Sequence, residues 1–162
     1  MTTTTTTIDY RSARSWLTLA VFLIVVIGVG GFIGSQSTPG TWFENLAKPP
    51  FNPPSWVFAP VWTILYVMIA IAGWRIWMAR PNSPAMGLWV AQMLANWLWS
   101  PVWFTAHLLW GAFAIITVML GLIIGFILVA RKTDTIAAWL FVPYLAWVSF
   151  ATLLNFSIAI LN

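Results

Sequence analysis

Polar side chains recur along one face of a long apolar stretch, and their types suit hydrogen bonding rather than covalent chemistry. Gln92, Asn96 and Ser100 are spaced four residues apart, which places them on one face of a helix. Such a stripe either bonds neighbouring helices, at about 0.6 kcal/mol per contact, or lines an internal pocket for a ligand. Both interpretations are open. Pro101 follows the stripe and predicts a kink, because proline lacks the backbone N–H.

Tryptophan is the second unusual feature, with thirteen residues in a chain of 162. Most lie near the ends of apolar stretches, where an interfacial aromatic belt explains them. Four lie well inside these stretches: Trp62, Trp97, Trp99 and Trp147. Trp62 shares a helical face with Tyr66, and Trp147 shares one with Tyr144 and Ala151. These indoles either fill space between helices or form walls for a flat aromatic ligand, which would stack against them.

The sequence lacks the residues on which ordinary catalysis depends. It contains no cysteine, which excludes disulfides, thiolate chemistry and cysteine-ligated metals. Its one histidine, His107, is expected at a membrane interface rather than on a haem iron. No Asp or Glu lies inside an apolar stretch, which argues against a pump or an ion-coupled carrier. We expect no metal site. The sequence also offers no general base or nucleophile that would indicate an enzyme.

The elements that must position these residues are membrane-spanning helices. Apolar residues make up 61% of the chain, and five stretches reach the roughly 20 residues that cross a bilayer: 16–33, 57–77, 87–108, 111–129 and 139–161. A bilayer forces such stretches to be helical. We therefore predict an all-α integral membrane protein, a bundle of five transmembrane helices over 16–162. A polar tail over 1–15 precedes it, and its threonine-rich start is expected to be disordered.

The longest connection, 35–55, contains five prolines and several large apolar side chains. Trp42, Phe43 and Leu46 fit one helical turn, which predicts a short helix in this connection. The connection is either a rigid connector that lies on lipid headgroups or a lid over a cavity.

Charge is distributed unequally between the two ends of the predicted bundle. Six basic residues fall on the side of the N-terminus and only Lys48 on the other: Arg11, Arg14, Arg75, Arg80, Arg131 and Lys132. This asymmetry predicts a cytoplasmic N-terminus and favours a bacterial inner membrane, with an outer membrane as the alternative. The net charge of +4 is thereby explained without nucleic acid, and we expect none as a partner.

Small residues four apart predict close helix packing, either within the bundle or in a homodimer. The pairs are Gly30 with Gly34, Ala91 with Ala95, and Gly121 with Gly125.

The order of motifs resembles the TspO family of tryptophan-rich sensory proteins and translocator proteins, which includes the peripheral benzodiazepine receptor of animals. The matching residues are PGxWFxxLxKPxFxPPxWxF from Pro39, VWxxLY from Val61, QxxxNxxWS from Gln92 and VPYxxWxxxAxxxNF from Val142. The resemblance covers the chain from Pro39 to its end. Two positions depart from the family: Phe51 stands where relatives usually have Trp, and no basic residue follows Phe156 to complete the sterol motif of animal members.

The resemblance implies a five-helix bundle, commonly homodimeric, that binds protoporphyrin IX, haem and other hydrophobic aromatic small molecules. Such a protein acts as a receptor, sensor or transporter of tetrapyrroles, and light-dependent porphyrin breakdown is implied for some members. Porphyrin is then a ligand, and no cofactor is required. The alternative is a passive carrier or membrane scaffold without a dedicated ligand.

The resemblance also implies a set of site residues. Trp62 and Trp147 would face the ligand and are the candidates for its photochemistry. Asn96, Trp99, Ser100 and Ala151 would complete the pocket, and Phe43 and Pro53 would close it. Tyr66 and Gln92 join this set because they share faces with Trp62 and Asn96.

Overall fold

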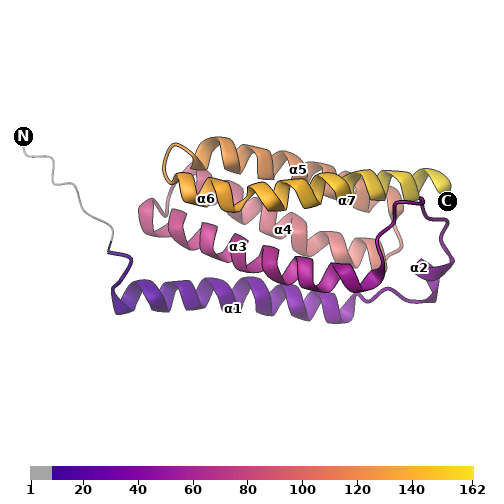
Figure 1. Cartoon of the computed structure of the whole chain (residues 1–162), viewed down its shortest axis with the longest axis horizontal. Coiled ribbons are helices and arrows are strands. Elements are labelled where there is room, and N and C mark those ends of the chain that lie inside the picture. The colour runs from indigo at the N-terminus through magenta and orange to yellow at the C-terminus, as the bar shows by residue number, and fades with distance from the viewer. Residues whose placement is uncertain (1–8) are drawn as a thin grey trace, which may run out of the picture.

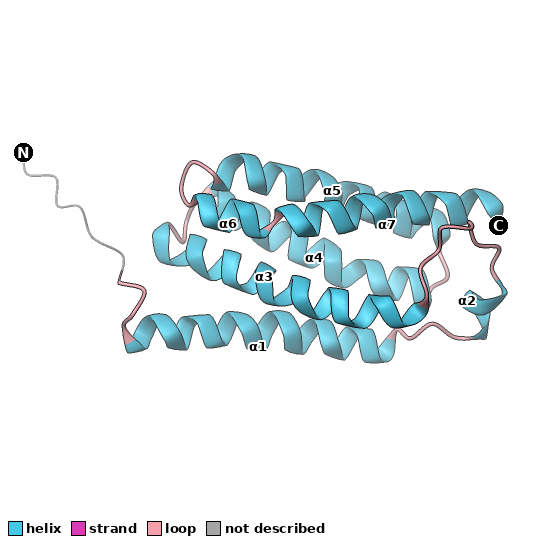
Figure 2. Cartoon of the chain, viewed as in Figure 1, coloured by secondary structure: helices cyan, strands magenta, loops and turns pink. Residues whose placement is uncertain are grey.

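The computed structural model describes residues 9–162, and every regular element in that range is helical (Figures 1 and 2). The elements are α1 (Ala13–Gln36), α2 (Thr41–Asn45), a 3₁₀ turn η1 (Ser55–Val57), α3 (Phe58–Ala79), α4 (Pro84–Phe104), α5 (Leu109–Ala130), α6 (Thr135–Leu140) and α7 (Val142–Leu161). The prediction of disorder for the threonine-rich start lies outside the described residues. Helix α1 begins at Ala13, inside the range 1–15 that was expected to form the polar tail. Ser12 caps this helix by accepting a hydrogen bond from the Ser15 amide at 3.2 Å.

The long helices run side by side, and α6 leads into α7 along the same direction (Figure 1). The most extensive contact between two helices is that of α4 with α5. The contacts of α5 with α7 and of α1 with α3 come next. α2 lies beyond the end of α1 and near the C-terminal end of α7, at the opposite end of the bundle from the start of α1 (Figure 2). This arrangement brings the middles of α3, α4 and α7, which carry the candidate residues, into one interior.

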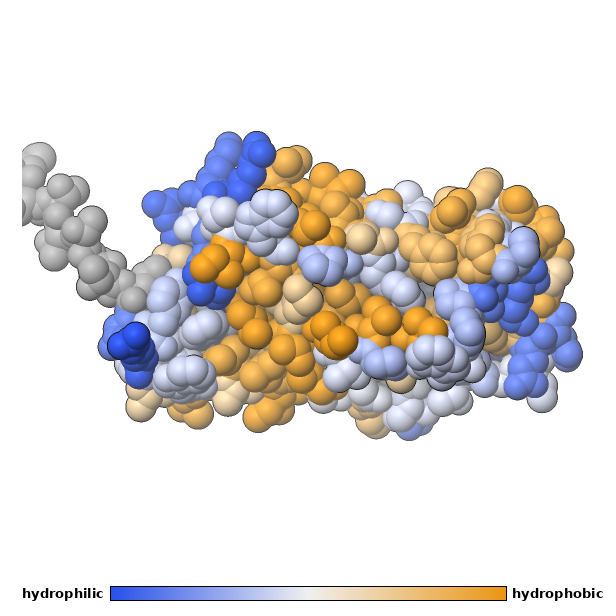
Figure 3. All heavy atoms as spheres, viewed as in Figure 1, coloured by the Kyte–Doolittle hydropathy of each residue, from blue (hydrophilic) through white to orange (hydrophobic). Residues whose placement is uncertain are grey.

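Four helical segments of the described chain are long and apolar enough to cross a membrane: Ala13–Gln36, Ser55–Ala79, Leu109–Ala130 and Thr135–Leu161. They correspond to four of the five predicted spans. The fifth prediction, 87–108, corresponds to α4, which is 21 residues long but less apolar because it carries Gln92 and Asn96. On the face shown in Figure 3, apolar residues cover much of the middle of the molecule, and the most hydrophilic residues lie towards its two ends. The protein is therefore an integral membrane protein.

Polar residues of α4 turn inward, which explains its lower hydropathy. The Gln92 side chain is fully buried and Asn96 nearly so. Trp89 also points inward and donates its indole N–H to the carbonyl oxygen of Ile69 in α3, at 2.9 Å. Gly73 makes this contact possible, because a Cβ at that position would overlap the indole of Trp89. The two helices consequently approach more closely here than larger residues would permit.

The two glycine pairs were predicted to allow close packing either within the bundle or in a homodimer. A Cβ on Gly30 would overlap the Tyr66 ring, and one on Gly125 would contact Leu88 at 3.5 Å. Their partners Gly34 and Gly121 have open space around the corresponding position. In each pair one glycine thus packs within the bundle and the other faces outward.

The last predicted span, 139–161, is interrupted in the structure. α6 ends at Leu140 and α7 begins at Val142, with Pro143 in its first turn, where the missing N–H needs no partner. Asp134 caps α6 by accepting from the Ala137 amide at 2.9 Å, and it also pairs with Arg75 of α3 at 2.9 Å. This ion pair ties α3 to the start of α6.

Candidate functional site

A continuous hydrogen-bonded network joins three helices in the bundle interior. The Tyr66 hydroxyl of α3 donates to Oδ1 of Asn96 in α4 at 3.0 Å. Asn96 Nδ2 donates to the Tyr144 hydroxyl of α7 at 3.0 Å, and this hydroxyl donates to Oε1 of Gln92 at 3.1 Å. Gln92 Nε2 completes the network by donating to the carbonyl oxygen of Trp89 at 2.9 Å. Interhelical bonding, one of the two interpretations of the polar stripe, is therefore present.

Tyr144 is the centre of this network, and the predicted site omits it. Its side chain is fully buried, and its hydroxyl both accepts from Asn96 and donates to Gln92, with the Met119 sulfur 3.3 Å away. One signal could have identified it. Tyr144 is the polar residue one turn before Trp147, and a buried hydroxyl in a membrane helix needs a partner.

Of the two tryptophans predicted to face a ligand, Trp62 packs on this network, and Trp147 packs on two phenylalanines. The Trp62 ring is 5.4 Å from Tyr66 and 6.2 Å from Tyr144, measured between ring centroids. Trp147 lies 5.7 Å from Phe58 and 5.8 Å from Phe150. The indole N–H groups of Trp147 and Trp97 are buried but have no hydrogen-bond partner in the described part of the chain. A buried N–H without an acceptor costs about 1–3 kcal/mol, so each can bind an acceptor from elsewhere.

Trp99 and Ala151 belong to a second polar contact, closer to the far end of the bundle. Trp99 donates its indole N–H to Oδ1 of Asn155 at 3.0 Å, and Asn155 Nδ2 donates to the carbonyl oxygen of Ala151 at 2.8 Å. Asn155 is a second residue that the predicted site omits. Ser100 is half-buried and takes part in neither polar contact, although it shares a face with Asn96.

The first connection lies over this end of the bundle and contains the expected short helix, α2. Phe43 of α2 packs 5.5 Å from Phe104 of α4, and Trp42 stacks on His107 with ring centroids 4.0 Å apart. Asn162, after α7, bonds both the amide and the carbonyl of Ala47, at 3.0 and 3.1 Å. Pro53 is half-buried. The connection is thus attached to α4 and to the end of α7, an arrangement that both the rigid-connector and the lid interpretations allow.

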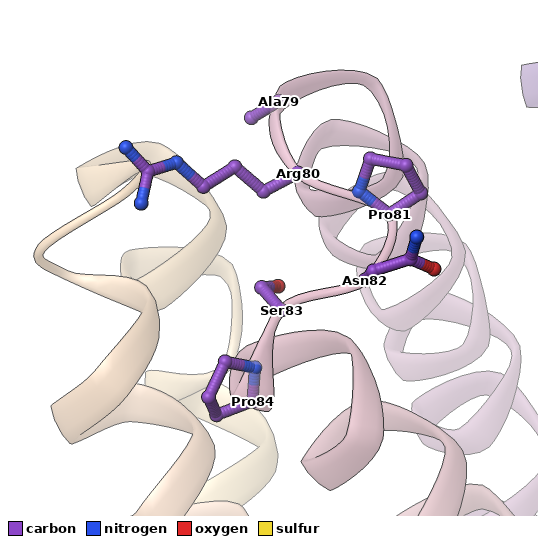
Figure 4. A pocket seen from close by; sticks show the side chains of 6 residues that line it. All are labelled: Ala79, Arg80, Pro81, Asn82, Ser83 and Pro84. Carbon is purple, nitrogen blue, oxygen red and sulfur yellow. The ribbon is translucent and has the colours of Figure 1, made fainter.

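The clearest recesses of the structure lie away from the candidate residues. One, of about 450 Å³, is at the turn between α3 and α4 and is lined by Ala79, Arg80, Pro81, Asn82, Ser83 and Pro84 (Figure 4). Arg80 extends from it towards the neighbouring helices. The other, of about 290 Å³, lies beside His107 and Asn162. None of the ten predicted site residues lines either recess. Those that are buried pack against one another and fill the interior between α3, α4 and α7.

The structure therefore divides the predicted residues into four groups, and Pro53 and Ser100 belong to none of them. Tyr66, Gln92 and Asn96 form the network with Trp62 packed on it. Trp99 and Ala151 meet at Asn155. Trp147 packs with Phe58 and Phe150, while Phe43 belongs to the cluster around α2 and Phe104.

Comparison with known proteins gives matches over almost the whole chain. The model of the TspO/MBR family matches residues 18–161. The chain is 36% identical over 147 residues to the tryptophan-rich sensory protein of Cereibacter sphaeroides, covering 91% of this chain and 92% of that protein. It is 34% identical over 145 residues to the translocator protein of Ovis aries, with coverage of 85% and 86%. It is 37% identical over 154 residues to the tryptophan-rich protein TspO of Chlorobaculum tepidum, with coverage of 90% and 96%.

Proposed function

Because this chain belongs to the TspO/MBR family of membrane proteins, we propose that it binds tetrapyrroles such as protoporphyrin IX and haem between α3, α4 and α7. It would act as a membrane receptor or sensor, or as a transporter, of these ligands. The names of its relatives, sensory protein and translocator protein, fit this general role. In this proposal the ligand contacts the Trp62 and Trp147 walls and is oriented by the polar groups of α4.

The observation that carries the proposal is the indole N–H of Trp147. It is buried among aromatic side chains, yet no acceptor among residues 9–162 satisfies it. A buried donor of this kind is destabilising by itself and gains a full hydrogen bond when a ligand supplies the acceptor. Phe58 and Phe150 on either side offer apolar faces and edges for the ring of a flat ligand.

The buried network supplies orientation. Tyr66 is partly buried and Asn96 is almost wholly buried. Hydrogen bonds between different helices hold both side chains, so their positions are fixed before a ligand arrives. A preorganised site loses less side-chain entropy on binding than a flexible one does. Because side chains fill the interior, the ligand would enter by moving the α2 lid and shifting Trp62 or Trp147 to other rotamers.

The same two tryptophans would support light-dependent porphyrin breakdown as a side activity. A bound porphyrin absorbs visible light, and the excited porphyrin would take one electron from Trp62 or Trp147 and pass it to dissolved dioxygen, which would be the oxidant of the reaction. No residue of the candidate site is needed as a general base or nucleophile, which fits a photochemical reaction. Replacing both tryptophans by Phe should abolish breakdown in illuminated samples while binding remains measurable.

The membrane arrangement of the proposal uses α4 as a fifth span. Its inward-facing Gln92 and Asn96 keep its outer surface apolar, with Leu94 and Leu98 exposed. The end that carries Arg80 and the start of α1 would face the cytoplasm of a bacterial inner membrane. A homodimer would form through small outward residues such as Gly34 or Gly121, which leave room for a second backbone.

A titration of the detergent-solubilised protein with protoporphyrin IX, followed by tryptophan fluorescence, tests the proposal. Trp147→Phe keeps the aromatic wall but removes the N–H, so the Kd should rise about tenfold, which is the free energy of one hydrogen bond. Trp110→Phe is the matched control, because Trp110 is exposed on α5. Quenching that is linear and identical in all three proteins would indicate partition into the micelle. That result would favour the passive carrier or scaffold instead.

A further inference from the structure

The proposed ligands carry carboxylates, and the site described so far offers them no positive charge. A carboxylate is costly to place in the middle of a bilayer, so it should lie at one end of the bundle, beside a cation. We propose that Lys48 binds a carboxylate of the ligand and makes the protein selective for carboxylate-bearing tetrapyrroles over neutral ones. This inference rests on the proposed function, because it assigns a role to a residue next to the same site.

Contacts with the backbone hold the Lys48 ammonium in place. Nζ donates to the carbonyl oxygen of Glu44 at 2.9 Å and to that of Leu46 at 3.1 Å. It also lies 4.8 Å from the centre of the Phe43 ring, a cation–π distance. An ammonium has three protons, and these contacts use two of them. The third is available to an acceptor from outside the protein, and little side-chain entropy remains to be lost.

No carboxylate of the described residues competes for this ammonium. Glu44 contacts it through its backbone carbonyl, and the ion pair of the described chain, Arg75 with Asp134, lies at the opposite end of the bundle. Lys48 is also the one lysine or arginine at the α2 end, since the other six basic residues belong to the N-terminal segment, the end of α3 and the connection after α5. An anionic group on this side therefore has one permanent cation with which to pair.

Aromatic contacts lead from Lys48 towards the candidate site. Phe43, under the ammonium, packs 5.5 Å from Phe104, and Phe104 packs 5.9 Å from Trp99. Trp99 is one of the predicted site residues and donates to Asn155. The cation thus lies at the end of the bundle and the aromatic rings lie further inside. A flat macrocycle with acidic groups along one edge has its charged and apolar parts in the same order. The macrocycle would contact the rings, and a carboxylate would reach Lys48.

The experiment compares protoporphyrin IX with its dimethyl ester, which has the same macrocycle but no charge. Kd values are measured for both ligands with the unmodified protein, Lys48→Met, Lys48→Arg and the control Arg80→Met. Arg80 is exposed in the recess at the other end, so Arg80→Met should change neither Kd. Lys48→Met should weaken binding of the acid about tenfold, as for one charge-assisted hydrogen bond at a partly exposed position. It should leave the Kd of the ester unchanged, and Lys48→Arg should retain most of the preference for the acid.

The ester serves as an internal check on folding, because its unchanged Kd in Lys48→Met shows that the aromatic site is intact. The inference is overturned if the unmodified protein binds both ligands but the ratio of their Kd values is the same in Lys48→Met. It is also overturned if Arg80→Met lowers the preference as much as Lys48→Met does. Failure of the proposed function has a different result: neither ligand then binds saturably to the unmodified protein.

Discussion

Replacing Tyr144 by Phe removes one oxygen atom from the centre of the bundle and should be among the most destabilising conservative changes in the chain. The hydroxyl accepts from Asn96 and donates to Gln92, and it has no solvent around it. Two interhelical bonds at the membrane-protein average of about 0.6 kcal/mol each give roughly 1.2 kcal/mol as a lower figure. The two buried polar atoms left unsatisfied raise the cost above this figure, within the range of about 1–3 kcal/mol for the loss of a buried hydrogen-bond partner. We expect the free energy of unfolding to fall by about 2 kcal/mol.

The assay is reversible unfolding in mixed micelles with increasing amounts of a denaturing detergent, followed by tryptophan fluorescence. Ser149→Ala is the control, because its hydroxyl lies on the exposed face of α7 and bonds only within that helix, to Leu145. It should change the free energy by less than about 0.5 kcal/mol. A second variant, Gln92→Met, shares the lost contact, so the double variant with Tyr144→Phe should cost less than the sum of the two. Full additivity, or a Tyr144→Phe variant as stable as Ser149→Ala, would refute the role given to the network.

Two further predictions concern helix packing and the ion pair. Gly73→Ala should lower the free energy of unfolding by about 2 kcal/mol, because its Cβ would displace the indole of Trp89 and overpack the interior; Gly121→Ala, with open space around it, should match the unmodified protein in the same detergent titration. Arg75→Met should cost about 2 kcal/mol by leaving the nearly buried Asp134 carboxylate unpaired, an effect that differential scanning calorimetry would detect as a lower Tm. Equal stability of the two glycine variants, or an unchanged Tm for Arg75→Met, would contradict these assignments.

The positions of the long helices could be predicted from the sequence because a bilayer permits few alternatives to a helix of about 20 apolar residues. α1, α3 and α5 begin and end within a few residues of the predicted spans. The break between α6 and α7 could not be predicted with the same ease. Apolar composition continues through Phe141, and a proline in the first turn of a helix resembles one inside a longer helix until the preceding residues are seen.

The candidate site could be predicted in its members but not in its connections. Periodicity places Gln92 and Asn96 on one face of α4, yet it does not identify the partner on the facing helix. That partner, Tyr144, depends on how α4 and α7 are rotated against each other. Asn155 could not be predicted for the same reason, because its hydrogen bond with the Trp99 indole joins α4 to α7. Side-chain packing in the interior, rather than sequence spacing, decides such contacts.

The shallow position of α1 has a consequence for how the protein is made. Only 11% of its most apolar segment is buried, compared with 39% for the last span, and its main neighbour is α3. The ribosome completes α3 roughly 40 residues after α1, which at ~5–20 residues per second is a delay of a few seconds. During that time α1 lacks the helix on which it mainly packs. Its apolar surface is stable against lipid during this delay. Gly30 can pack against Tyr66 only once α3 has entered the bilayer.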